Sequence, residues 1–323
     1  MSLPRSLGVF LLLLVLPKLA TALDRNAFRF HDYDLLVRLD PAAQAISARG
    51  KLTVTNISNV PQKALALQIS STLEWRLVEA AGTPVQYLTQ TYTTDIDHTG
   101  AVSEAIVTLP QALAPGASIV MEVGYSGVIP ASAERLTRMG APKDLAERSE
   151  WDQVSEFFTA VRGVGHVAWY PVSIEAVSLS DNRVFEALGE WRSREVKSSM
   201  RAEFCWIAAL GADDDPELQL TVVTNGNLEG IGKRNTEISG DKLAATGCST
   251  HRFADIGLTI PSFVVDEFEV LLRPTVTVYH LAGQERYAQA YADAVEAVQP
   301  FLTEWFGPKR DDKVVVVELD HAG

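Results

Sequence analysis

Alternating apolar residues are the feature of this sequence that most restricts its fold. Every second residue is apolar from Leu35 to Leu39, and the same spacing recurs from Ile119 to Tyr125. A period of two places one face of a β-strand against a core. Turn-forming prolines and glycines separate these runs, for example at Gly82 and Pro115. Several short strands divided in this way predict a domain in which one sheet packs on another.

The pattern changes between residues 131 and 165. Arg and Glu become more frequent there, and glycines at positions 163 and 165 follow. This composition, together with apolar residues at helical spacing, predicts a helical insertion near 131–165 on the β domain. The two glycines are expected to end it. The apolar residues that recur there at helical spacing are Val154, Phe157, Phe158 and Val161.

A third pattern begins near Pro274. Residues 275–280 have the alternation of a strand, and residues 283–305 carry the only long helix pattern, an apolar stripe at spacings of three and four. Pro300 lies inside that stripe and is expected to kink the helix or to separate its last turn. Residues 314–317 are four valines, which predict a strand buried on both faces. Since little sequence follows to cover such a strand, we expect the chain to be the front part of a longer protein.

Several segments resemble the aminopeptidase N family of zinc metallopeptidases. Residues 33–41 (YDLLVRLDP) and 50–56 (GKLTVTN) look like the opening strands of that family. Further similarity lies in LAPG at 113–116, MEVGYSG at 121–127, VVTNGNL at 222–228 and EWFGP at 304–308. None of these segments carries chemistry, so the resemblance rests on the scaffold.

The resemblance implies a mainly β fold in which a large β-sandwich or saddle domain precedes the start of an α/β thermolysin-like domain. On this basis we expect residues 23–274 to be the β-rich N-terminal domain and 275–323 to be the first strand, helix and strand of a truncated catalytic domain. Residues 1–22 are expected on separate grounds to be a signal peptide. The family's activity implies a catalytic zinc ion in the full-length protein and peptides or proteins as substrates.

Two departures from the family pattern concern its chemistry. The sequence contains no H-E-x-x-H, the motif that places two histidine zinc ligands one helical turn apart. We therefore expect this chain alone to bind no catalytic zinc and to be inactive. Residues 165–172 (GHVAWYPV) stand where family exopeptidases carry a glutamate that binds the substrate amine, and no glutamate aligns with it. An unpaired buried amine is costly, so we expect weak exopeptidase specificity.

Five residues are candidates for the substrate cleft because of their place in this alignment. His166 and Tyr170 lie in the segment that faces the cleft in the family, although a packed or hydrogen-bonded histidine is the more common role for a residue such as His166. The other three candidates follow the valine strand, and they are Asp320, His321 and Gly323.

The first 22 residues have the three parts of an export signal. Arg5 supplies the positive charge, residues 7–16 form a short apolar run, and Ala20-Thr21-Ala22 is a small-residue cleavage site. They predict a periplasmic or secreted protein, with an uncleaved N-terminal anchor as the alternative. No later segment is long and apolar enough to make a stable membrane span. Outside the cytoplasm, Cys205 and Cys248 could form a disulfide, or they could be two buried free thiols.

The net charge of −13 argues against nucleic acid as a partner. The sequence thus predicts the N-terminal part of an exported, aminopeptidase-like zinc metallopeptidase whose β domain walls the substrate cleft. The alternative is a non-catalytic, β-rich module that binds peptides or proteins, because one fold can serve several functions.

Overall fold

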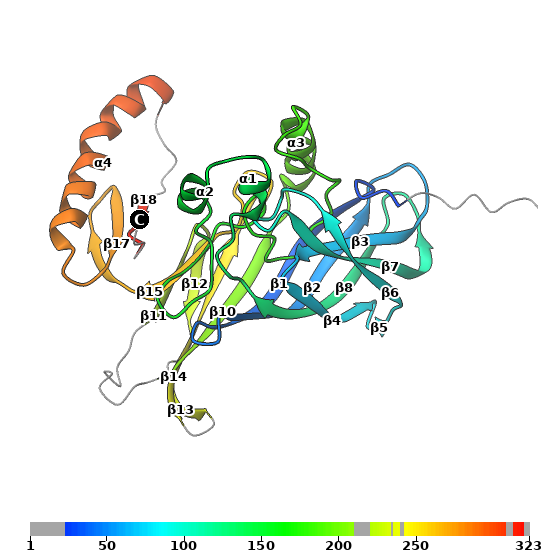
Figure 1. Ribbon diagram of the computed structural model, residues 1–323, viewed down its shortest axis with the longest axis horizontal. Coiled ribbons are helices and arrows are strands. Elements are labelled where there is room, and N and C mark those ends of the chain that lie inside the picture. The colour runs from blue at the N-terminus through cyan, green and yellow to red at the C-terminus, as the bar shows by residue number, and fades with distance from the viewer. Residues whose placement is uncertain (1–22, 210–219, 234, 240–241, 308–312, 320–323) are drawn as a thin grey trace, which may run out of the picture.

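The chain is mainly β, as the alternating sequence predicts (Figure 1). The computed structural model describes residues 23–209, 220–233, 235–239, 242–307 and 313–319. No helix among these residues is long and apolar enough to cross a membrane. Cys205 and Cys248 form a disulfide.

A large twisted sheet forms the body of the molecule. Its strands run in the order β12-β14-β10-β1-β2-β8-β4-β5, and β13 also pairs with β14. The pairing of β1 with β10 is parallel, and it joins residues 33–39 to residues 200–206. The strands are β1 (Phe28–Asp40), β2 (Ala45–Asn56), β4 (Leu73–Ala80), β5 (Thr83–Pro84), β8 (Ser118–Val128), β10 (Met200–Ala209), β12 (Asn227–Ile231), β13 (Asn235–Ser239) and β14 (Lys242–Phe253).

Strand β1 shows how the sequence fits its sheet. Phe28 and Phe30 are buried at even positions, whereas Leu35 and Val37 are buried at odd positions. A β-bulge between residues 31 and 34 causes this change of phase, and Asp32 within it has a φ of 51°. Because an extra residue in one strand shifts which side chains face the core, both halves of β1 can point inward.

Two smaller sheets complete the β domain. The first consists of β3 (Gln62–Ser70), β7 (Ala101–Leu113) and β6 (Tyr87–Thr93), and the second consists of β11 (Leu220–Thr224), β15 (Phe263–Glu267) and β9 (Thr159–Val161). One continuous core includes buried residues from all three sheets. Trp169 lies within it, with its ring centroid 5.4 Å from that of Phe263 and 5.8 Å from that of Phe204.

Three short helices also belong to the β domain. They are α1 (Glu134–Arg138), α2 (Lys143–Ser149) and α3 (Val184–Glu195). Helices α1 and α2 lie within the insertion expected near 131–165, but residues 154–161 are not helical, and Val161 lies on β9. Helix α3 has no strong pattern in the sequence, because it buries only Val184, Trp191 and Glu195.

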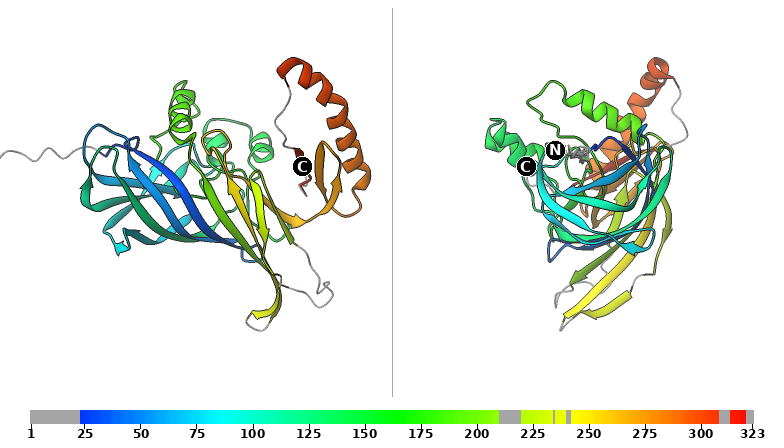
Figure 2. Two further views of the ribbon diagram at one scale, coloured as in Figure 1. Left: turned by 180° about the vertical axis from the view of Figure 1, so that it is seen from behind. Right: turned by 90° about the vertical axis from the view of Figure 1, so that its right-hand side faces the viewer.

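A separate lobe follows the β domain. It contains β16 (Glu269–Leu272), β17 (Val276–His280), α4 (Glu285–Phe306) and β18 (Val314–Val317). Its small core joins Val276 and Val278 of β17 to Ala288 and Ala292 of α4. The left panel of Figure 2 shows this lobe at the end of the molecule opposite β3, β6 and β7.

The structure excludes one of the two outcomes expected for Pro300 and corrects the expectation for the valine strand. Helix α4 runs unbroken from Glu285 to Phe306 with Pro300 inside it, so its last turn is not separated. Pro300 is exposed, and water can therefore satisfy the carbonyl group that the proline cannot pair. The valine strand β18 is not buried on both faces. It lies at an edge of its sheet, and Val315 is 51% exposed.

Candidate functional site

The structure describes two of the five predicted cleft residues, and it places one of them in the core and the other partly at the surface. Tyr170 is fully buried, with its ring centroid 5.0 Å from that of Trp169 and 5.9 Å from that of Tyr33. Its side chain therefore belongs to the core and has no exposed surface with which to contact a substrate. Asp320, His321 and Gly323 lie outside the described residues.

His166 is exposed in part and belongs to a network of charged side chains. Its Nδ1 atom lies 3.4 Å from Glu150 Oε2 and 3.2 Å from the Arg135 guanidinium, and the side chain is 36% exposed. Glu150 is buried and accepts a hydrogen bond of 3.0 Å from Arg135 Nε. Burial acts to raise the pKa of Glu150, but hydrogen bonding to His166 and the charge of Arg135 outweigh it and hold that pKa below its ordinary value. Because Arg135 belongs to α1, these contacts join α1 to the segments that carry Glu150 and His166.

The same region contains one of the two groups of described residues whose ligand atoms lie close enough together to hold a metal ion. Ligand atoms of Glu150, Asp152 and His166 lie within 4.8 Å of one another. However, Glu150 pairs with Arg135, and Asp152 Oδ2 accepts hydrogen bonds of 2.9 and 2.6 Å from Arg162. A cation would have to displace both arginines, since each carboxylate is already neutralised. These residues therefore do not fit a catalytic zinc ion.

A second group with ligand atoms close together is Glu203, Cys205 and Cys248. The two thiols form a disulfide, so they offer no thiolate to a metal. Neither group among the described residues fits the zinc site that the family resemblance implies for the full-length protein.

A pocket opens where the Asn225-Gly226 turn joins β11 to β12. An Asn-Gly pair is typical of tight hairpins, but β11 pairs with β15 and β12 pairs with β14, so the two strands diverge into different sheets. Gly226 permits the close approach of β14, because a Cβ atom there would lie 2.7 Å from the Arg252 carbonyl oxygen. The cavity between the diverging strands has a volume of about 250 Å³.

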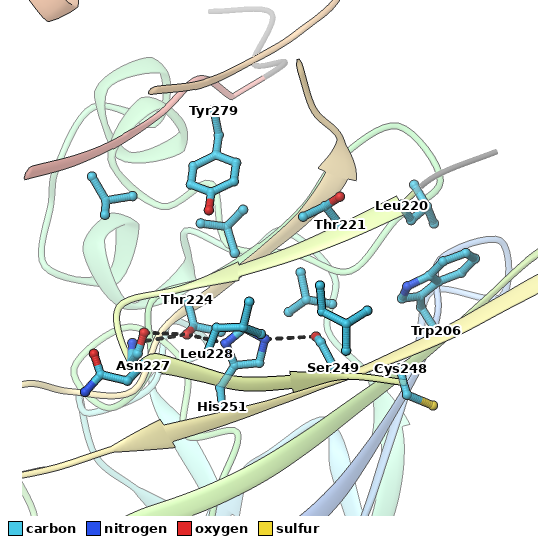
Figure 3. A pocket seen from close by; sticks show the side chains of 15 residues that line it. Trp206, Leu220, Thr221, Thr224, Asn227, Leu228, Cys248, Ser249, His251 and Tyr279 are labelled. Carbon is cyan, nitrogen blue, oxygen red and sulfur yellow. Dashed lines mark hydrogen bonds between the residues drawn. The ribbon is translucent and has the colours of Figure 1, made fainter. Parts of the chain in front are cut away.

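The pocket is lined mainly by apolar side chains from six of the described strands and contains His251 in its wall (Figure 3). The ring of His251 is buried; its Nδ1 lies 3.0 Å from Thr224 Oγ1 and its Nε2 lies 2.8 Å from Ser249 Oγ. Burial lowers the pKa of His251 to about 4. The histidine is therefore neutral at physiological pH and cannot act there as a cationic group.

Sequence reasoning did not identify this pocket. His251 stands alone in the sequence with no motif around it, and the pocket depends on pairings between segments that lie far apart. The only local signal is Asn225-Gly226, which is typical of tight hairpins and here gives the opposite arrangement. Gly226 does not have the positive φ that a type I′ hairpin turn requires.

No protein-family model and no curated protein match this sequence. Solved structures do match it. An M1 zinc metallopeptidase from Deinococcus radiodurans superposes with a TM-score of 0.58 at 15% identity, over 90% of this chain and 56% of that chain. Native yeast LTA4 hydrolase superposes with a TM-score of 0.51 at 12% identity, over 93% of this chain and 40% of that chain.

This chain has the fold of the M1 zinc metallopeptidases. The match confirms the fold that the scaffold segments predict, including the mainly β domain. At these identities the likeness concerns the M1 fold alone. The chain spans 56% of the length of the Deinococcus structure, so any activity of a whole protein with this fold is a matter for proposal.

Proposed function

We propose that this chain is the scaffold part of an exported, aminopeptidase-like zinc metallopeptidase. In this proposal the β domain walls one side of a peptide-binding cleft, and residues outside this chain hold the zinc ion. The observation that carries the proposal is the match of 90% of this chain to an M1 zinc metallopeptidase at a TM-score of 0.58.

The chemistry of the described residues supports the proposal that the zinc ligands lie outside this chain. In one of the two groups with metal-ligand spacing, Glu150 and Asp152 are paired with arginines. In the other group, Cys205 and Cys248 form a disulfide. The sequence has no H-E-x-x-H. If zinc is bound, its ligands would come from the continuation of the polypeptide, where the metal would activate a water molecule for attack on a peptide bond.

Export is supported by two independent features. The first 22 residues carry the charge, the apolar run and the small-residue site of a signal peptide. The Cys205–Cys248 disulfide is a bond that persists mainly in oxidising compartments. We propose a periplasmic or secreted location on these grounds.

The first test is to read the gene beyond residue 323. The proposal expects an H-E-x-x-H motif there, followed by a glutamate ligand several helical turns later. If the motif is present, the longer protein should cleave peptides in a zinc-dependent manner. Because no glutamate occupies the amine-binding position, it should discriminate weakly between free and acetylated amino termini. A gene without the motif would contradict the peptidase proposal.

The second candidate is a non-catalytic module that binds peptides or proteins. It is favoured by the absence of a usable metal site among the described residues together with an uncharged, largely apolar pocket. The same gene sequence separates the two candidates, since only the peptidase requires zinc ligands in the continuation.

A further inference from the structure

The pocket between β11 and β12 has the properties of a binding site for an uncharged group. Among the residues that the structure describes, no Asp, Glu, Lys or Arg lines it, although the chain as a whole has a net charge of −13. Its one ionisable imidazole, His251, has both nitrogens occupied by hydroxyl groups of the protein. A charged ligand would lose its hydration in this pocket without gaining a partner, so the lining selects against charge.

The walls are apolar and come from both parts of the molecule. Leu228 and Ile231 of β12 are 55% and 68% exposed, and Val315 of β18 is 51% exposed. Trp206 closes one end, and Tyr279 of β17 points toward the pocket from the opposite lobe (Figure 3). Exposed apolar side chains that converge on one cavity mark a ligand site more often than they mark chance exposure.

The size of the cavity limits its occupant. Its volume of about 250 Å³ is smaller than the pockets that enclose drug-sized ligands. A dry cavity of roughly 150 Å³ accepts a benzene ring, so this one has room for a single aromatic or large aliphatic side chain. The pocket can therefore recognise one side chain and not a complete ligand.

The margins of the pocket suit an extended backbone. Among the described strands, β11 pairs on one side only, with β15, and β12 pairs only with β14. An unpaired strand edge can form main-chain hydrogen bonds with an added peptide, while a neighbouring pocket takes one of its side chains. At the rim, Asn227 provides an exposed amide with both donor and acceptor groups.

We infer that the pocket between β11 and β12 binds an apolar side chain of an extended, uncharged peptide segment. The inference rests on the proposed function in one respect only, namely that the chain handles peptides. It requires neither zinc nor catalysis by this chain. A peptidase could use such a site to hold substrate, and a binding module could use it to hold a partner.

The test is a binding titration with blocked peptides. The probe is acetyl-Ala-Phe-Ala-amide with a fluorinated phenylalanine, followed by fluorine NMR against the purified exported chain. The control peptide carries Asp in place of Phe. We expect saturable binding of the Phe peptide and none of the Asp peptide. Equal binding of the two peptides, or no saturable binding of the Phe peptide, would overturn the inference.

Variants locate the binding. Leu228→Glu adds a carboxylate to the pocket wall and should raise Kd by about tenfold or more, because a pocket for an apolar group then holds an unpaired charge. Leu88→Glu on β6 is the matched control, since Leu88 is 65% exposed on a strand of another sheet. An unchanged Kd for Leu228→Glu would contradict the assignment.

Two further outcomes would also count against the inference. Concentration-dependent dimers that Leu228→Glu abolishes would show that a second copy of the chain fills the pocket. Binding by this chain but not by a longer form of the protein would show that the pocket is internal to the complete molecule. Both readouts are independent of hydrolysis, so a failed inference remains distinct from a failed peptidase proposal.

Discussion

Arg25 forms a two-point ion pair with Glu104. Arg25 Nε lies 2.7 Å from Glu104 Oε1, and Arg25 Nη2 lies 3.0 Å from Glu104 Oε2. Glu104 is fully buried on β7, whereas Arg25 lies just after the predicted signal cleavage site. The pair therefore fastens the start of the predicted mature chain to the core of the β domain.

Removing the arginine should destabilise the fold. Burial acts to raise the pKa of Glu104, but hydrogen bonds from Arg25, Gln68 and Gln90 outweigh it and keep the pKa below its ordinary value. In Arg25→Ala the carboxylate keeps only the two glutamines, so we expect a loss of roughly 3–5 kcal/mol in the free energy of unfolding. Urea denaturation measures this loss. Arg183→Ala, which breaks an exposed pair with Asp181, is the control and should have no measurable effect.

The disulfide should stabilise the pairing of β10 with β14. Cys205 and Cys248 are direct partners in that ladder and are 43 residues apart in sequence. A cross-link of this span contributes about 4 kcal/mol in the chain-entropy description. We expect no free thiol in the exported chain without reductant, and a lower Tm for Cys205→Ala/Cys248→Ala. Two titratable thiols in the untreated, unfolded chain would refute the bond.

The stability of the fold should fall in acid partly through His251. Its pKa is lowered from 6.5 to about 4 by burial, so the unfolded chain binds more protons between these values. The contribution is complete above pH 6.5 and is lost as the pH falls toward 4. Its size is on the order of 3 kcal/mol. His251→Gln should therefore show a flatter dependence of Tm on pH in this window, whereas parallel curves would rule out this role.

Two buried histidines should respond in opposite ways to replacement by leucine. His98 is fully buried, and neither ring nitrogen has a hydrogen-bond partner among the described residues; Nε2 lies 4.0 Å from Asp97 Oδ2. His251 has partners for both nitrogens. His98→Leu should leave stability unchanged or raise it by about 1 kcal/mol, and His251→Leu should lower it by about 1–3 kcal/mol. Equal losses in urea denaturation would contradict this distinction.

Sequence patterns predicted the elements whose signals are local. The strands β1, β2 and β8 each bury alternate residues over most of their length, and α4 carries an apolar stripe. Helix α3 escaped prediction because only two of its buried residues, Val184 and Trp191, are apolar, and it contains Gly189. The valines of β18 indicate a strand but not its depth, which depends on what packs against it.

The candidate site was less accessible to sequence reasoning for a physical reason. His166 and Tyr170 are close in sequence, yet one reaches solvent and the other fills the core, because side-chain direction depends on local backbone geometry. The pocket between β11 and β12 depends on the pairing of β12 with β14 and of β11 with β15. Such long-range registers leave no periodic trace near Asn225 and Gly226.

The central claim is that this chain supplies the scaffold, and its continuation the zinc site, of an M1-type peptidase. The most direct measurement compares zinc content and peptide hydrolysis for this chain and for the protein expressed from the gene beyond residue 323. The account predicts no bound zinc and no hydrolysis for this chain, and about one zinc ion per molecule with chelator-sensitive hydrolysis for the longer protein. A longer protein that binds no zinc and cleaves no peptide would contradict it.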